Sequence, residues 1–117
     1  MLREAKQEGA VFVSGVVYVE LQAYPGATEA FLDNFLEITG IRVDFELEPR
    51  VWKEAGRRCA RYAARRRMSS AGTGPRRLLA HFLVGAHALL QADRLLTLDS
   101  GIYERDFSDV RLVPLNL

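Results

Sequence analysis

Several features that mark particular protein classes are scarce or missing in this sequence. Cys59 is the only cysteine, so there is neither an internal disulfide nor a cysteine zinc cluster, which favours a reducing compartment. No apolar run is long enough to cross a bilayer, and the opening residues, MLREAKQEGA, are polar rather than a signal-peptide core. These absences predict a soluble cytoplasmic protein that does not enter a membrane.

Acidic residues are missing from one long stretch. Residues 55–92 carry eight arginines and no acid, whereas residues 1–54 carry five basic and ten acidic side chains. Residues 93–117 add three basic and five acidic side chains, so a basic block lies between two acidic segments although the net charge is only +1. Such a block can attract a polyanion, and a solvated helix face is its ordinary alternative.

The size of 117 residues and a hydrophobic content of 49% fit one globular domain with one core. Strands are predicted at 11–13, 41–46, 95–98 and 110–115, from runs of β-branched and other apolar residues. Helices are predicted between them: one capped by Ser14 and ending after Tyr24, one between Thr28 and Gly40, and others beginning at Pro49 and Pro75.

Two of these helices show an apolar face. In the second helix the apolar residues that share a face are Phe31, Leu32, Phe35, Leu36 and Ile38. In the third, the residues that recur at intervals of three and four are Trp52, Ala55, Cys59 and Tyr62, which leaves the arginines mostly on the other faces. The fourth helix, residues 76–92, is apolar nearly all round and is expected to be deeply buried.

The order of these elements predicts an α/β sandwich on a mainly parallel sheet. In such sheets function gathers at the carboxyl ends of strands, which draws attention to Asp99 directly after LLTL. Without further information Asp99 could equally cap the turn that follows it.

The segment AHFLVGAHALLQADRLLTLDSGIYERDF, at residues 80–107, resembles the C-terminal signature of VapC-type PIN domains. That signature is an acid, an apolar helix, then LLT-x-D and an aromatic-containing turn. Val17–Leu21, VYVEL, is similar to the family's second acidic position. The resemblance covers essentially the whole chain and implies a single PIN-like domain over residues 1–117, a three-layer α/β sandwich with a mainly parallel sheet.

The resemblance also implies a function. PIN domains are small nucleases that gather carboxylates around Mg²⁺ or Mn²⁺ and cut RNA, and those of the toxin type are neutralised by a cognate antitoxin and form homodimers. Glu20 matches the helix-borne acid and Asp99 the strand-end acid, so both are expected to be catalytic metal ligands. Hard divalent cations prefer such oxygen ligands, and can activate water and neutralise charge on a phosphate.

Two positions depart from the family pattern. His81 stands where the family has an aspartate, and neutral imidazole suits Mg²⁺ poorly, although His81 remains a candidate metal ligand. The family's opening central strand, which ends in an aspartate, has no counterpart, so the domain is expected to be N-terminally incomplete. A weak or inactive Mg²⁺-dependent endoribonuclease is therefore predicted. The alternative is a catalytically degenerate PIN-like module that only binds protein or RNA, and a receiver-like or flavodoxin-like domain would fit the fold class alone.

The individual site residues also have structural interpretations. Glu20 lies among valines and Leu21, so a partly buried acid is expected. His81 could be a hydrogen-bonded structural histidine, and no role is assigned to His87. Arginine is suited to bidentate phosphate contact, so RNA binding, or docking of an acidic antitoxin segment, is predicted for a set of the arginines. That set is Arg65, Arg66, Arg67, Arg76 and Arg77.

Overall fold

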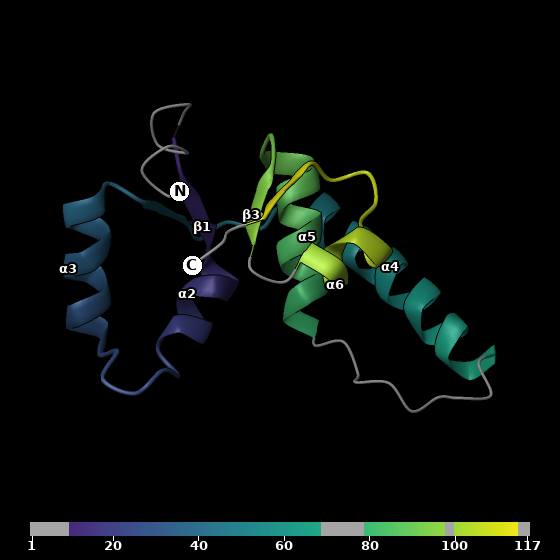
Figure 1. Cartoon of the computed structure of the whole chain (residues 1–117), viewed down its shortest axis with the longest axis horizontal. Helices are drawn as coiled ribbons and strands as arrows, with labels where there is room; N and C mark the ends of the chain where they lie inside the picture. The colour runs from purple at the N-terminus through teal and green to yellow at the C-terminus, as the bar shows by residue number, and fades with distance from the viewer. Residues whose placement is uncertain (1–9, 69–78, 98–99, 115–117) are drawn as a thin grey trace. The chain divides into compact units, whose positions relative to one another are not determined.

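The computed structural model describes residues 10–68, 79–97 and 100–114. Figure 1 shows the elements, which follow one another as β1 (Phe12–Ser14), α2 (Gly15–Leu21), α3 (Glu29–Thr39), β2 (Arg42–Asp44), α4 (Pro49–Met68), α5 (Leu79–Gln91), β3 (Leu95–Thr97), α6 (Ser100–Asp106) and β4 (Leu112–Pro114). The chain divides into two compact units, Met1–Leu47 and Glu48–Leu117, called here the first and the second unit. A single PIN-like domain over residues 1–117 stays a prediction.

Local signals in the first unit set the helix ends as expected. The Ser14 side chain accepts a hydrogen bond from the Val17 N–H at 3.3 Å and caps α2, and Thr28 caps α3 in the same way through Phe31. Gly40 ends α3 in the left-handed conformation with φ 72°, which glycine adopts without steric cost. α2 itself ends at Leu21, earlier than predicted, and a turn continues from it.

β1 and β2 of the first unit pair in parallel, with Val13 opposite Val43. The two strands are joined through α2 and α3, as a parallel connection requires. The Tyr18 hydroxyl donates a 2.7 Å hydrogen bond to the Asp33 carboxylate, and this bond links α2 to α3. The Tyr18 ring also meets Phe45 edge-on, at 5.5 Å between centroids.

The apolar arc of α3 is only partly buried. Leu32 and Leu36 are buried, together with Ile41 after the helix. Phe31, Phe35 and Ile38 are 59%, 44% and 75% exposed. Since these three recur at i, i+4 and i+7, they form an exposed apolar row along α3.

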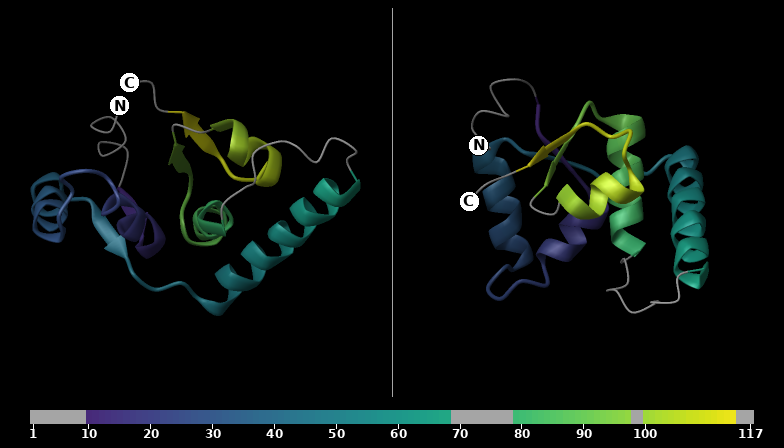
Figure 2. Two further views of the ribbon diagram at one scale, coloured as in Figure 1. Left: turned by 90° about the horizontal axis from the view of Figure 1, so that it is seen from below. Right: turned by 45° about the vertical axis from the view of Figure 1, so that its right-hand side comes forward.

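In the second unit β3 and β4 also pair in parallel, with Leu96 opposite Val113, and α6 connects them. α5 packs against α4 and against α6, and α6 lies beside β4, as Figure 2 shows. The predicted mixed α/β class with parallel strand pairing is confirmed. The strands that the structure describes form two separate two-stranded sheets, and the three-layer sandwich stays a prediction.

Aromatic rings fill the core of the second unit. Phe82 and Phe107 are almost fully buried, with ring centroids 6.4 Å apart, and Tyr62 packs on Phe82 while Tyr103 packs on Phe107. A Cβ atom on Gly85 would overlap the Phe107 ring, so α5 needs a glycine there to let the ring approach its backbone.

The buried face of α4 differs from the predicted one. Val51 is fully buried, whereas Trp52, expected in the core, is 54% exposed. Arg58, expected on an outer face, is buried at 9% exposure. The inward stripe therefore runs through Val51, Ala55 and Arg58, at i, i+4 and i+7, and shares only Ala55 with the predicted stripe.

α5 is buried over its central part, as predicted, although Leu79 at its described start is exposed. Its predicted beginning at Pro75 lies outside the residues that the structure describes. Within the described ranges, no helix is both long and apolar enough to span a membrane.

Candidate functional site

Glu20 lies in the last turn of α2 and is exposed, so the expectation of a partly buried acid is wrong. It lines a shallow hollow of about 340 Å³ together with Ala23, Tyr24 and Pro25. The carboxylate is the only charged group among these lining residues, and the other walls are largely apolar. Glu20 is therefore accessible to a cation or a ligand from solvent.

His81 lies in the first turn of α5 and is half-buried. Its ring meets Tyr103 edge-on, with centroids 6.0 Å apart and planes at 84°. This packing holds the imidazole against α6, which fits the structural interpretation and leaves the ligand role a prediction. His87, further along α5, is buried.

Asp99 lies outside the described residues, as do Arg76 and Arg77. Among the residues that are described, no group of three or more His, Cys, Asp or Glu side chains could hold a metal ion. The predicted donor set, Glu20, Asp99 and His81, contains only two carboxylates. It fits Mg²⁺ poorly, because an imidazole contributes neither charge nor the hard oxygen that this ion prefers.

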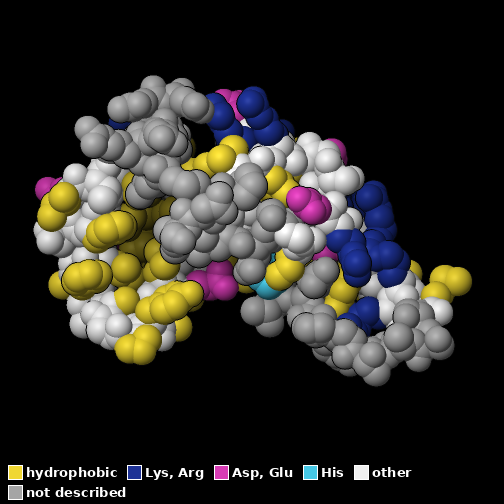
Figure 3. All heavy atoms as spheres, viewed as in Figure 1, with side chains coloured by type: hydrophobic (Ala, Val, Ile, Leu, Met, Phe, Trp, Pro, Cys, Tyr) yellow, Lys and Arg dark blue, Asp and Glu magenta, His cyan; other side chains and the backbone are white. Residues whose placement is uncertain are grey.

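The arginines at the end of α4 differ in their surroundings. Arg65 pairs with Asp106, whose side chain is buried, and lies 5.9 Å from the Tyr62 ring centroid. Arg66 donates a 3.3 Å hydrogen bond to the Tyr62 hydroxyl. Arg67 is exposed, and Figure 3 shows Lys and Arg side chains gathered over α4. The structure thus uses Arg65 for internal packing, so it is the least suited of the three to contact a phosphate.

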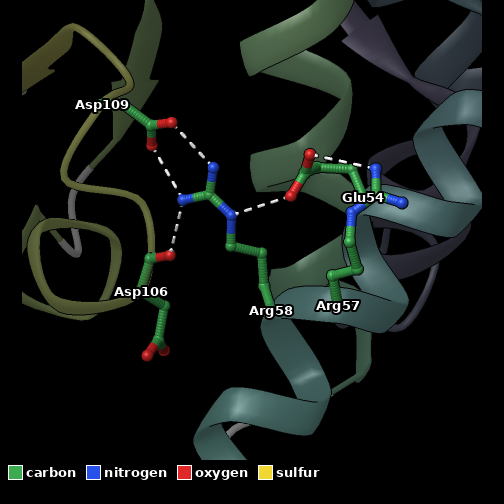
Figure 4. A network of polar contacts seen from close by, with 5 residues as sticks. All are labelled: Glu54, Arg57, Arg58, Asp106 and Asp109. Carbon is green, nitrogen blue, oxygen red and sulfur yellow. Dashed lines mark hydrogen bonds and ion pairs between the residues drawn. The ribbon is translucent and has the colours of Figure 1, made fainter.

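Sequence reasoning missed a buried polar group with several hydrogen bonds in the described part of the chain, which is Arg58 (Figure 4). Its guanidinium forms a fork with Asp109: Nη1 donates to Oδ1 at 2.8 Å and Nη2 to Oδ2 at 2.7 Å. Nη1 also donates to the Asp106 carbonyl oxygen at 3.1 Å, and Nε donates to Glu54 at 3.0 Å. The carbon of the guanidinium lies 4.9 Å from the centre of the Phe107 ring. We call these contacts the Arg58 network.

The Arg58 network pairs one cation with two carboxylates, Asp109 and Glu54. The hydrogen bonds from Arg58 hold the pKa of Asp109 and the pKa of Glu54 below their usual ranges, against the raising effect of burial. The bond to Asp109 raises the pKa of Arg58 itself. All three groups are therefore charged at neutral pH, and bidentate pairing makes this a strong type of contact.

The Arg58 network joins α4 to the segment between α6 and β4. Its donors point at acceptors of the same unit, so its role is to hold the core closed over Phe107 rather than to bind a ligand. One signal for it was present in the sequence. Arg58 follows Val51 and Ala55 at helical spacing, which places it on the inward stripe once Val51 is taken as the first core residue.

Comparison with known proteins adds no family. No protein-family model matches the chain, and neither the curated proteins nor the solved structures include a match to it.

Proposed function

We propose that this chain is a PIN-like, Mg²⁺- or Mn²⁺-dependent endoribonuclease of the toxin–antitoxin type, weakened in this form by the histidine at position 81. The observation that carries the proposal is the segment around LLT-x-D. The order α5, β3, α6 in the described residues supports the proposal, since a helix followed by a strand is what the PIN signature calls for, and Asp99 follows β3 by two residues in the sequence. An acid after a strand of a parallel pair is typical of a functional site in α/β proteins.

In this proposal Glu20 and Asp99 are the metal ligands. A divalent ion held there would activate water and offset charge on the scissile phosphate. The exposure of Glu20 supports its part, because a ligand for a hydrated ion must reach solvent. His81 replaces a carboxylate with a neutral ring that packs against Tyr103, so we expect weak ion binding and slow cleavage.

The proposed partners are an RNA substrate, a cognate antitoxin and a second copy of the chain. The exposed apolar row of α3 supports a protein partner, since large apolar side chains at i, i+4 and i+7 are typical anchors of helix-mediated binding. Hydrophobic side chains are visible over α3 in Figure 3. A cytoplasmic location stays part of the proposal.

Cleavage of a generic RNA in the presence of Mn²⁺ tests the function. We expect slow cleavage by the unaltered chain, loss of cleavage in Glu20→Gln and in Asp99→Asn, and faster cleavage in His81→Asp. Glu37→Gln, an exposed acid on α3, is the matched control and should cleave normally. Cleavage that persists in both Glu20→Gln and Asp99→Asn would overturn the assignment of these ligands. No cleavage by His81→Asp would overturn the nuclease itself.

A second candidate is a PIN-like module that only binds protein or RNA. The packing of His81 against Tyr103 favours it, because a ring held in this way serves the core of the second unit instead of an ion. Retention of RNA without cleavage, in the unaltered chain and in His81→Asp alike, would identify this second function.

A further inference from the structure

The outer face of α4 combines three cationic side chains in a row. Lys53, Arg57 and Arg61 follow one another at i, i+4 and i+8, so they lie on one side of the helix about 6 Å apart along its axis. All three are exposed. We call them the cationic row.

The cationic row differs from the other arginines of α4. Arg58 and Arg65 are committed to acids of the same unit, the first as part of the buried network. Within the row, only Arg57 has an ion pair among the described contacts, at 3.2 Å to Glu54, and its side chain remains exposed. Glu54 is also held by Arg58, so a phosphate can approach the exposed Arg57 side chain from solvent while Glu54 stays paired with Arg58.

Trp52 directly precedes Lys53, the first member of the cationic row, and lies about 100° around the helix from it. The Trp52 side chain is 54% exposed. A Cβ atom on Gly56 would meet nothing within 4 Å, so the helix surface one turn beyond Trp52 is open. A flat ligand can lie on the exposed part of the indole while its charged part reaches Lys53.

We propose that this face of α4 binds single-stranded nucleic acid, with a base stacked on Trp52 and consecutive phosphates on Lys53, Arg57 and Arg61. Exposed aromatic rings beside a cationic groove are the usual elements of such sites. A duplex would keep its bases stacked on each other and leave the indole unused. An acidic peptide would satisfy the cations but would have no flat ring system for Trp52.

Helical spacing places the cationic row away from the inward stripe of Val51, Ala55 and Arg58, and Figure 2 shows the course of α4 in the second unit. α4 packs along α5 on one side, and its opposite side is turned away from the other elements of that unit. The site lies on α4 alone and needs neither a metal ion nor Glu20, so it extends the proposed function without resting on cleavage.

Binding of a fluorescein-labelled single-stranded RNA of about 12 nucleotides, within the usual range of site sizes, tests the proposal. Anisotropy is measured in EDTA, so that metal-dependent cleavage cannot interfere. We expect Trp52→Ala to weaken binding roughly 5- to 150-fold, the range for loss of one stacked base, and Trp52→Tyr to restore most of it. Circular dichroism checks that each variant is folded.

The salt dependence tests the cationic row. Replacing Lys53, Arg57 and Arg61 together with alanine should reduce the slope of log affinity against log salt by about 2, since each phosphate contact adds about 0.7. The matched control replaces three exposed arginines outside α4 and changes the net charge equally; it should keep the slope. Those arginines are Arg42, Arg105 and Arg111.

Three further probes separate the ligands. The affinity for DNA of the same sequence shows whether the ribose contributes to binding. Binding of either single-stranded RNA or single-stranded DNA supports the proposed site. An abasic strand should bind the unaltered chain and Trp52→Ala equally, because it offers phosphates without bases. Any of three results would overturn the proposal. The first is an equal loss of affinity in the row variant and its control, and the second is an unaltered affinity of Trp52→Ala for RNA. The third is tighter binding of polyglutamate than of RNA. Absence of RNA cleavage would leave it standing.

Discussion

The first and the second unit use their apolar side chains in opposite ways. Among the described residues, the first unit buries Leu32, Leu36 and Ile41 and exposes seven large hydrophobic side chains, from Phe12 to Phe45. The second unit buries nine hydrophobic side chains, among them Phe82 and Phe107, and exposes three. The second unit thus has a packed core, whereas much of the apolar surface of the first is open to a partner.

The charges of the two units are also opposite. Over residues 10–47 there are six acidic side chains and one basic, whereas the described residues from 48 to 114 hold eleven basic and six acidic side chains. Acids in the second unit are largely paired, as in the Arg58 network. In the second unit the acids are fewer than the basic side chains and are largely paired. The basic side chains that remain in excess can attract a polyanion.

The close approach at Gly85 gives the largest expected effect on stability. Gly85→Ala puts a methyl group into the Phe107 ring and should lower the free energy of unfolding by about 3 kcal/mol, the upper end for overpacked cores. Gly56→Ala is the matched control, since its Cβ meets open space and alanine favours a helix by about 0.5–1 kcal/mol. Urea denaturation measures both. Similar effects of the two substitutions would contradict the packing described here.

The two sides of α3 should respond differently to truncation. Leu36→Ala removes a buried side chain and should cost about 2 kcal/mol, the lower end for such changes, because the first unit buries little around it. Phe35→Ala removes an exposed ring and should change the free energy of unfolding by less than about 0.5 kcal/mol. Thermal or urea unfolding compares them. A larger loss for Phe35 than for Leu36 would mean that the row is covered in solution.

Arg58 should matter more than any other cation for stability. Arg58→Met keeps the packing on Phe107 but removes the hydrogen bonds to charged groups, which should cost about 2 kcal/mol at neutral pH. Arg61→Met, an exposed neighbour, is the control. Because the pKa values of Asp109 and Glu54 are lowered in the folded state, their stabilisation is present above the usual carboxylate range and is lost as pH falls through the lowered values.

Unfolding measured from neutral to acidic pH therefore distinguishes the two variants. The unaltered chain and Arg61→Met should lose stability in acid, and Arg58→Met should lose much less. Parallel curves for all three proteins would be inconsistent with the network.

Tyr18 gives the smallest effect, confined to alkaline pH. The hydrogen bond to Asp33 raises the pKa of Tyr18 from 10.0 to about 12, with smaller contributions from burial and nearby acids. The bond therefore stabilises the first unit fully below pH 10 and is lost as pH rises through about 12. Ultraviolet titration should show a late-ionising tyrosine, and Asp33→Asn should remove this late step. A late tyrosine that survives Asp33→Asn would have another cause.

Local features of the fold were predictable from the sequence. Ser14, Thr28, Gly40 and Pro49 lie at helix ends as expected, because capping depends on a few neighbouring residues. The parallel strand pairs follow from the alternation of strands with helices.

Burial was harder to predict than helix position. Trp52 is more hydrophobic than Arg58, yet the helix turns Arg58 inward because Asp109 and Glu54 satisfy its charge there. Those partners lie up to 51 residues away, and no periodicity reveals them. Glu20 is exposed although valines surround it in the sequence, because α2 buries none of its residues.

Binding of Mn²⁺, followed by the electron paramagnetic resonance of the free ion, tests whether Glu20 and Asp99 hold a divalent ion, and it needs no substrate. We expect weak binding by the unaltered chain, tighter binding by His81→Asp, and loss of that gain when either Glu20→Gln or Asp99→Asn is added to His81→Asp. Tight binding that ignores Glu20 and Asp99, or no gain from His81→Asp, would contradict this assignment.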